Sequence, residues 1–394
     1  MHLNVCLPAV EPETLQPPRT CPYPDRRQRK QPCRGTRFKL HQVNCHKPLH
    51  DTRHSQVRAQ RYLCLSCRRT FRVYPSGVSS AQQSATLKAL SVLLYILGLS
   101  YQGVSDLLEA LNQPVCKSTV YNNVQAAGAQ AIQLRTTWRK QPSMKVAVLG
   151  IDFTHVKRLG QDTIVAVASS ILSGAALDFE IIDDESAPTI TRWIRELADS
   201  VGAEVLVTDD ADALKTVAND LGLDQQICRA HVNRNVHDLI ASLGTKALEQ
   251  PDRVPRGLRV RVEQFLADLQ SLEAIITGLP HDGQQQLDTL AERYQPAPPP
   301  QPAHKASMWY RMRLLALDWS EHWSRLVRFQ AWRGTHGETL DGTNNVTEQI
   351  IGQRVKERYR TMRGYKRDAS ILNVSSLLGW VGMQPAGYNL GELV

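Results

Sequence analysis

Two aspartates follow short apolar runs in the middle of the chain, where they could hold a metal ion. Asp152 ends the run at 145–151, and Asp209 ends a similar run at 204–208. Apolar runs of this length, bounded by turn or polar residues, are typical of strands buried on both faces. An ionised carboxylate at such a place costs several kcal/mol unless a cation or another partner compensates it. A single aspartate there could equally cap a turn, so the cation hypothesis needs a second acid nearby.

The elements around these acids predict that the two carboxylates are neighbours. The patterns follow in this order: strands at 145–154, 163–168 and 176–182, a helix at 188–201, a strand ending at Asp209, a helix at 214–221 and a strand at 226–228. This order matches an RNase H-like fold, in which the first and fourth strands lie side by side. Two adjacent carboxylates repel each other and stay ionised only around cations, which favours a metal site.

Residues further along the chain resemble one family of transposases. Cys228 and His231, spaced Cys-x2-His at the start of a helix, resemble the signature of Mutator-like DDE transposases and their bacterial insertion-sequence relatives. The run 343–348, Thr-Asn-Asn-Val-Thr-Glu, resembles the lead-in to the third acid of that group. The resemblance covers residues 145–370. It implies a catalytic triad of Asp152, Asp209 and Glu348, with Asp210 as the alternative second acid and Asp212 as a weaker one.

The resemblance also implies the chemistry. The three carboxylates would hold two Mg²⁺ ions roughly 3.5–4 Å apart, one activating the attacking oxygen and one stabilising the leaving oxygen. Mn²⁺ could substitute. Water first frees a 3′-hydroxyl at the transposon end, and that hydroxyl then attacks target DNA. Cys228 and His231 would support the active site or the DNA end, unless they are a packed cysteine and a locally bonded histidine.

The implied setting is a homo-oligomer assembled on transposon ends and target DNA in the bacterial cytoplasm, at the nucleoid. Two other functions stay open. One is a DNA-binding regulator whose RNase H-like domain is inactive, and the other is a nuclease of the same fold that cuts without strand transfer.

A second set of candidate metal ligands lies in a basic segment near the N-terminus. Cys64 and Cys67 form a Cys-x2-Cys pair, which grips one side of a tetrahedral Zn²⁺ site when it stands on a hairpin tip. The second pair is Cys21 and Cys33. Eleven residues, including a basic stretch at 26–30, separate these two cysteines. Either an insertion lengthens the loop between Cys21 and Cys33, or Cys45 or His41 replaces one of these two ligands, or the site is damaged. The expected structural zinc ligands are Cys21, Cys33, Cys64 and Cys67.

Helical patterns at 85–97, at 101–111 and from 117 or 118 to 127 resemble a helix-turn-helix. Ser100 is suited to cap the second helix, and the turn at 112–114 ends it. The third helix would lie in a DNA major groove, although an ordinary three-helix packing unit has the same pattern. The residues expected to face DNA are Lys117, Ser118, Thr119, Asn122, Asn123 and Gln125.

Overall charge favours a polyanionic partner. The 394 residues carry 47 Lys and Arg against 38 Asp and Glu, a net charge of +9, and 42% are hydrophobic, enough for two or three domains. No apolar run reaches the roughly 18 residues that span a bilayer, so no membrane association is expected. Eight cysteines without a signal-peptide pattern favour metal ligands or thiols over disulfides.

A helix that starts near Glu348 is expected to continue through the basic run at 353–367 and to face phosphates. Its candidate DNA contacts are Arg354, Lys356, Arg358, Arg360, Arg363, Lys366 and Arg367.

The predicted architecture is multidomain α/β. Its parts are a loose lead-in at 1–20, a zinc ribbon at 21–75, a helix-turn-helix at 81–130, an RNase H-like domain at 145–242, an α-helical insertion at 243–342, and the last catalytic helix with a basic region at 343–394. Within the insertion, helical patterns at 260–279 and 308–329 flank a proline-rich loop at 295–300. Four tryptophans are expected in the core of the insertion: Trp309, Trp319, Trp323 and Trp332.

Overall fold

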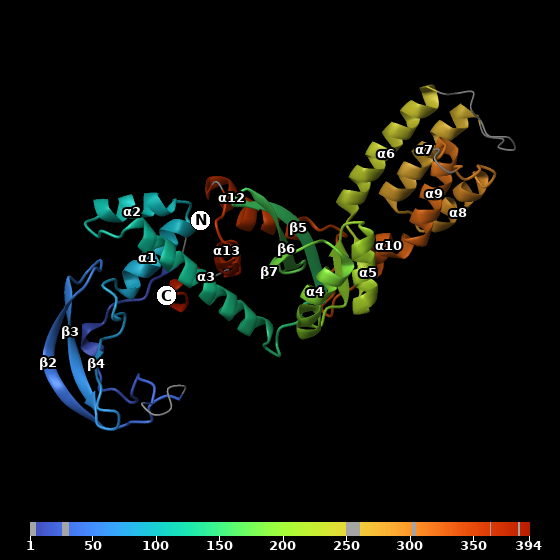
Figure 1. Ribbon diagram of the computed structural model, residues 1–394. Coiled ribbons are helices and arrows are strands. Elements are labelled where there is room, and N and C mark those ends of the chain that lie inside the picture. The colour runs from blue at the N-terminus through green and yellow to red at the C-terminus, as the bar shows by residue number, and fades with distance from the viewer. Residues whose placement is uncertain (1–4, 26–30, 250–260, 302–304, 363, 385–386) are drawn as a thin grey trace. The chain divides into compact units, whose positions relative to one another are not determined.

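The computed structural model describes residues 5–25, 31–249, 261–301, 305–362, 364–384 and 387–394 (Figure 1). The chain forms two compact units. The first combines Met1–Thr136 with Glu357–Val394, and the second is Thr137–Lys356. The segment 343–394, predicted to contain the last catalytic helix and a basic region, is divided between the two units at Glu357.

A five-stranded mixed sheet forms the centre of the second unit. Its strands, in sheet order, are β7 (Ala176–Ile182), β6 (Gln161–Ser170), β5 (Val148–Arg158), β8 (Val205–Thr208) and β9 (Asp224–Ile227). The first three strands are antiparallel, whereas β8 and β9 run parallel to β5. The predicted contact between the first and fourth strands is therefore confirmed.

Two helices make the crossovers of this sheet. They are α4 (Ala187–Val201) and α5 (Asp212–Leu221), and each ends at a glycine with a left-handed backbone, Gly202 and Gly222. Glycine adopts that conformation without steric cost, which explains why both helices stop there. In α4, Ile190, Ile194 and Leu197 are buried at helical spacing and cover the sheet.

Strand β5 is longer than its apolar run indicated. It pairs with β6 from Leu149 to Arg158, through a two-residue hairpin loop at Leu159 and Gly160. Both loop residues have positive φ, 51° and 84°, as in the turns that favour tight hairpins. Asp152 was predicted at the end of the strand, which is wrong. It lies inside the strand, at the point where burial on both faces gives way to alternating burial.

A helical part follows the sheet strands in the second unit. Its helices are α6 (Arg229–Glu249), α7 (Val262–Gly278), α8 (Gly283–Arg293), α9 (Met308–Glu321) and α10 (Trp323–Ala331). Both predicted helical regions are confirmed, and residues 295–300 lie outside helices. Trp309, Trp319 and Trp323 are buried in the core of this part. The placement of Trp332 there was wrong, because it packs with Val148 and Val205 of the sheet.

The first unit contains a three-stranded antiparallel sheet and a group of helices. The strands are β2 (Phe38–Pro48), β3 (Gln56–Cys64) and β4 (Thr70–Val73), and the helices are α1 (Ala85–Ile96), α2 (Tyr101–Ala110), α3 (Lys117–Arg139), α12 (Glu357–Met362) and α13 (Asp368–Gly382). The predicted cap of α2 is confirmed, since Ser100 Oγ accepts a 3.0 Å hydrogen bond from the Gly103 amide. Helix α3 extends well beyond the predicted end at 127.

The N-terminal segment is more ordered than its composition indicated. Strand β1 (Val5–Cys6) pairs in parallel with β10 (Tyr388–Asn389), and short 3-10 turns occupy Pro12–Thr14 and Leu390–Glu392. Val10 is buried beside Leu49 and Val57. The expectation of a loose lead-in is therefore wrong for residues 5–20, because pairing with the distant C-terminal strand could not be read from local pattern.

The helix that carries Glu348 is interrupted. Helix α11 (Asn345–Ile350) passes into a π-helical turn, Ile351–Lys356, and then into α12, which ends at Met362. The predicted helix through 367 is thus wrong in its last part. Gly364, with a φ of 97°, lies in the connection to α13, and the predicted contact Arg363 lies outside the described residues. Among the described helices, none is long and apolar enough to cross a membrane.

Candidate active site and cysteine cluster

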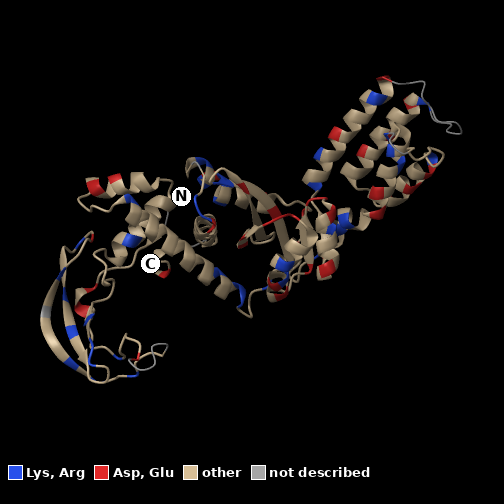
Figure 2. Cartoon of the chain, in the orientation of Figure 1, with Lys and Arg blue, Asp and Glu red and all other residues tan. Residues whose placement is uncertain are grey.

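Parallel pairing brings the first two predicted acids together. Residues 148–150 of β5 pair with residues 205–207 of β8, and continuing that register by two positions places Asp152 beside Asp209. Asp209 directly follows β8, which ends at Thr208. Burial raises the pKa of Asp152 to about 6, and the charges of Glu348 and Asp209 act in the same direction. The negative charges of Glu348 and Asp209 therefore act on the Asp152 carboxylate. Figure 2 shows acidic positions in this sheet region.

Asn344 ties the start of α11 to the strand that carries Asp152. Its Nδ2 donates to the carbonyl of Ile151 at 2.9 Å, and its backbone N–H donates to Cys228 Sγ at 3.2 Å. Its Oδ1 accepts from Thr347 Oγ1 at 2.6 Å. Asn344 is 1% exposed and Thr347 is fully buried. Because Glu348 follows Thr347 directly, these bonds set the position of its backbone relative to Asp152.

Gly150 permits this close approach. A Cβ atom at this residue would lie 2.4 Å from Thr347 Oγ1 and 2.8 Å from Asn344 Oδ1, distances that real Cβ contacts do not show. Ser169, on the neighbouring strand β6, completes the contact through a 2.8 Å hydrogen bond with the Thr347 hydroxyl. We call Gly150, Ser169, Asn344 and Thr347 the α11 anchor. The anchor was missed in the sequence, although the Thr-Asn-Asn run before the acid was a signal for it.

His231 and Cys228 lie beside Glu348, at the start of α6. His231 Nδ1 is 3.6 Å from Glu348 Oε1. The neighbouring Cys228 thiol raises the pKa of His231, and the charges of Glu348 and Asp152 add to this effect. Burial opposes ionisation of Cys228, but hydrogen bonds from His231 and the Asn344 backbone lower the pKa of Cys228 overall. The ligand atoms of Cys228, His231 and Glu348 all lie within 4.8 Å of one another.

The alternative second acids point elsewhere. Asp210 Oδ1 is 3.0 Å from Lys215 Nζ, and Lys215 also contacts Asp212 Oδ1 at 3.1 Å. Burial raises the pKa of Asp210 in spite of this lysine. The Asp212 side chain is almost fully exposed. Both residues follow β8, which ends at Thr208, and the charge of Asp209 contributes to the raised pKa of Asp152.

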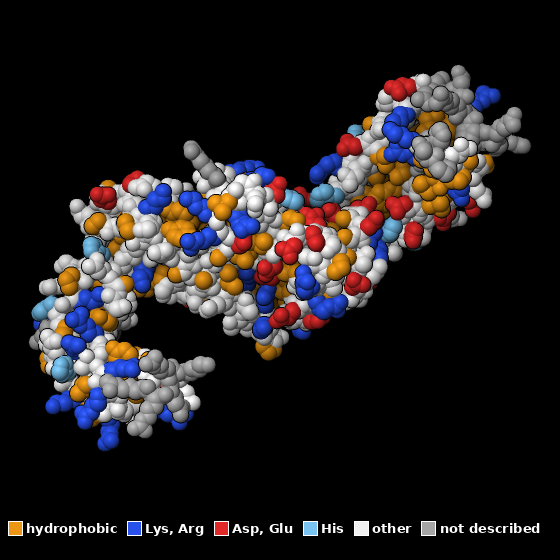
Figure 3. Space-filling model, viewed as in Figure 1, with side chains coloured by type: hydrophobic (Ala, Val, Ile, Leu, Met, Phe, Trp, Pro, Cys, Tyr) orange, Lys and Arg blue, Asp and Glu red, His pale blue; other side chains and the backbone are white. Residues whose placement is uncertain are grey.

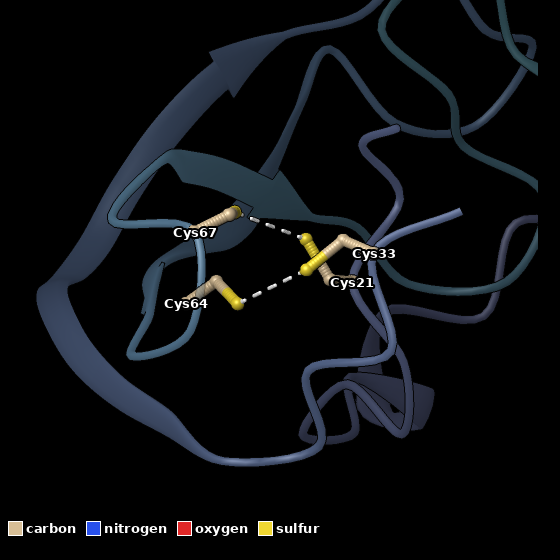
Figure 4. A group of neighbouring side chains, drawn as sticks. All are labelled: Cys21, Cys33, Cys64 and Cys67. Atoms are coloured by element: carbon tan, nitrogen blue, oxygen red, sulfur yellow. Dashed lines mark hydrogen bonds between the residues drawn. The ribbon is translucent and has the colours of Figure 1, made fainter. Parts of the chain in front are cut away.

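Four cysteines of the first unit form a buried cluster (Figure 4). Cys64 ends β3 and Cys67 lies in the turn to β4, where Arg68 has a positive φ of 58°. Cys21 and Cys33 approach from the preceding loops. Cys21 Sγ is 3.6 Å from Cys67 Sγ, and Cys33 Sγ is 4.0 Å from Cys64 Sγ. Four sulfurs bound tetrahedrally at about 2.3 Å would be about 3.8 Å apart, so the cluster has the dimensions of a zinc site.

The other proposed ligands do not belong to this cluster. Cys45 is buried on β2 opposite Ala59, and His41 is exposed on the same strand. Backbone hydrogen bonds from Cys67 and Ser66 outweigh the effect of burial and lower the pKa of the Cys64 thiol to about 7. Burial raises the pKa of the neighbouring Cys21 thiol to about 12, so a metal ion bound by this cluster would displace the proton of Cys21.

The candidate DNA contacts differ in exposure. Lys117, Ser118 and Asn122 are exposed on α3, as expected. Asn123 and Gln125 were expected to be exposed, which is wrong: both are half-buried and bonded inside the unit, to Gln83 and Ser91 and to Asn373 respectively. In the basic run, the expectation for Arg358 is wrong because this residue is buried; Arg354 is half-buried, and the exposed members are Lys356, Arg360, Lys366 and Arg367.

Comparison with known proteins gives little support beyond this geometry. No family model matches the sequence, and no curated protein does. Among solved structures, the chain is similar to the HTLV-2 integrase catalytic core domain in complex with magnesium, in its dimeric form. The identity is 15%, the match covers 33% of this chain and 86% of that one, and the TM-score is 0.19.

Proposed function

We propose that this protein is a DDE transposase, which cleaves DNA at transposon ends and joins those ends to target DNA. The observation that carries the proposal is the convergence of Asp152, Asp209 and Glu348. Asp152 lies on β5, Asp209 directly follows the adjacent parallel strand β8, and Glu348 lies on a helix anchored to β5. The order and pairing of the elements support an RNase H-like catalytic domain.

The donor set fits Mg²⁺, which prefers oxygen ligands and keeps several water positions. Glu348 Oε1 is buried and has no hydrogen-bond partner among the described residues. Burial of Asp152 disfavours its charged form unless a cation is close. Asp152, Asp209 and Glu348 would therefore hold the metal. When bound, two such ions activate the attacking oxygen and stabilise the leaving oxygen of a phosphodiester.

The other residues near the site would position these acids. The α11 anchor holds Glu348 at the edge of β5, because its buried hydrogen bonds leave α11 little freedom to move. His231, beside Glu348, limits the orientations of that carboxylate. Catalytic groups displaced by 1 Å can lose about 10²-fold in rate, so such support is part of the machinery.

The first unit would bind DNA. The cysteine cluster would hold one structural Zn²⁺ in a zinc ribbon, and α1, α2 and α3 would form the helix-turn-helix. Lys117, Ser118 and Asn122 are exposed on the first turns of α3, where a recognition helix meets base edges and phosphates. The setting we propose is a homo-oligomer on DNA in a bacterial cytoplasm.

The test is a reaction of the full-length protein with Mg²⁺ and a duplex carrying the inverted repeats that flank its coding sequence, together with a supercoiled plasmid target. A transposase gives cut ends and then products joined to the plasmid. Cut ends that never join would assign a nuclease of the same fold. Binding without cleavage, in protein that is folded and loaded with metal, would assign a regulator and refute the proposal.

A further inference from the structure

A pocket of about 550 Å³ lies within the first unit, between α2, the start of α3 and the segment that connects α12 to α13. Its size falls within the roughly 300–1,000 Å³ typical of ligand pockets. Tyr101, Tyr121 and Tyr365 line it together with Met362, so much of its wall is aromatic or apolar. Tyr101 is held in place by stacking on Tyr95 with ring centroids 4.7 Å apart.

Two of the most deeply buried side chains in this wall carry a polar atom without a hydrogen-bond partner among the described residues. Arg358 is 5% exposed and Tyr365 is 3% exposed, and both line the pocket. Arg358 Nη2 and the Tyr365 hydroxyl have no hydrogen-bond acceptor or donor among the described residues. Unsatisfied buried polar groups are rare because each costs free energy, so a ligand that hydrogen-bonds to them would stabilise this wall. Burial raises the pKa of Tyr365, and its hydroxyl therefore stays neutral and able to donate.

The charge of the pocket has one sign. The described residues that line it include four cations and no carboxylate. Arg358 is fixed deep inside, with its guanidinium carbon 4.4 Å from the centre of the Tyr95 ring. Lys117, Lys366 and Arg367 are exposed at the rim. Figure 3 shows apolar side chains bordered by Lys and Arg in the region where Figure 1 labels α2 and α12.

An anionic ligand with a flat aromatic portion satisfies all three observations. We propose that this pocket receives one nucleotide of DNA that has turned out of its duplex, with the base against the tyrosines and a phosphate at the basic rim. The inference rests on the proposed function, in that it takes DNA as the partner of the first unit. Stacking on aromatic rings and hydrogen bonds to the base edge compensate for the stacking and pairing that the nucleotide loses.

The experiment measures the affinity of the full-length protein for two duplexes of equal length at one salt concentration. One is fully paired, and the other carries a single unpaired 2-aminopurine, whose fluorescence reports its surroundings. We expect the unpaired nucleotide to strengthen binding by about tenfold, the effect of stacking one base. Its fluorescence should change and saturate with protein.

Two variants locate the effect. Tyr365→Phe removes only the unpartnered hydroxyl, and it should reduce the advantage of the bulged duplex by about fivefold, the effect of one hydrogen bond. The matched control is Tyr359→Phe, because Tyr359 stacks on Tyr365 with centroids 6.4 Å apart but does not line the pocket. The control should keep the full advantage.

Failure of the pocket proposal and failure of the proposed function give different results in this experiment. Equal affinity of the wild-type protein for both duplexes would overturn the pocket proposal and leave DNA binding intact, whereas binding to neither duplex would refute the proposed function first. An advantage that Tyr365→Phe leaves unchanged would place the unpaired base elsewhere. A free nucleotide offers the same base and phosphate as a nucleotide of DNA. Titration of the protein with deoxyadenosine monophosphate alone tests this alternative. Saturable binding of that nucleotide, without any advantage of the bulged duplex, would assign a free nucleotide and overturn the DNA source.

Discussion

The α11 anchor gives a prediction that separates positioning from binding. Asn344→Ala removes the hydrogen bonds of the side chain to Ile151 and Thr347, so the Ile151 carbonyl loses this donor, whereas the Thr347 hydroxyl keeps its hydrogen bond with Ser169. Each hydrogen bond removed costs about 0.5–1.5 kcal/mol, and each unsatisfied group costs more. We therefore expect the free energy of unfolding to fall by about 2–4 kcal/mol, measured by urea denaturation.

The catalytic effect should be larger than the structural one. Glu348 follows the anchor directly, so loosening the start of α11 should displace its carboxylate and lower the single-turnover cleavage rate by about 10²-fold. The affinity for DNA should stay unchanged, because Asn344 is buried and cannot contact DNA. Single-turnover cleavage and equilibrium binding, measured on the same preparation, separate the two effects.

Three further variants keep this prediction decisive. Asn345→Ala is the matched control, since Asn345 is the exposed neighbour at the start of the same helix, and it should behave like wild type. Thr347→Ser keeps the hydroxyl that bonds Asn344 and Ser169, whereas Thr347→Val removes it. The serine variant should retain most of the activity that the valine variant loses. Wild-type cleavage by Asn344→Ala would refute the idea that this anchor holds Glu348.

Zinc content, salt dependence and the choice of the second acid give three other predictions. Freshly purified protein should contain about one Zn²⁺ per chain by metal analysis. Cys64→Ser should lose the zinc and Cys45→Ser should keep it, because Cys45 lies outside the cluster. Absence of zinc from folded wild-type protein would contradict the zinc ribbon. DNA binding should weaken steeply with salt. The combined change of Arg360, Lys366 and Arg367 to Gln should flatten the slope of log binding constant against log salt concentration by about 0.9 for each phosphate that the protein no longer neutralises. An unchanged slope would mean that other residues bind the phosphates. Asp210→Asn should cleave DNA at close to the wild-type rate but lose its ion pair with Lys215; an inactive Asp210→Asn beside an active Asp209→Asn would show that the second acid had been chosen one residue too early.

The sequence was informative wherever side-chain periodicity determines the structure. Alternating or continuous apolar runs predicted all five strands of the central sheet, and amphipathic spacing predicted α4 and α5. Adjacency of Asp152 and Asp209 followed from the match between the order of these elements and an RNase H-like fold. The length of β5 did not, because its hairpin turn at Leu159 and Gly160 lacks the usual asparagine or aspartate signal.

Features that depend on distant contacts could not be predicted. The pairing of β1 with β10 joins residues near the two ends of the chain, and no local pattern encodes it. Trp309 and Trp332 were both expected in the helical core as large aromatic residues of the insertion. Trp332 instead packs on the sheet, whereas Trp309 lies in the helical core. The α11 anchor needs Gly150 opposite Thr347, which are distant in sequence. The pattern of the basic run predicted a helix but not the break after Met362.

The most direct test of the central claim is the cleavage rate of three charge-removing variants at saturating Mg²⁺. Asp152→Asn, Asp209→Asn and Glu348→Gln keep the shape of each side chain but remove the charge that would hold the metal. We predict that each abolishes cleavage and strand transfer, that combining two adds no further loss, and that DNA affinity is retained. Asp162→Asn is the control, since Asp162 lies on the adjoining strand, exposed and paired with Lys157. Cleavage at the wild-type rate by any one of the three acid variants would contradict a shared metal site.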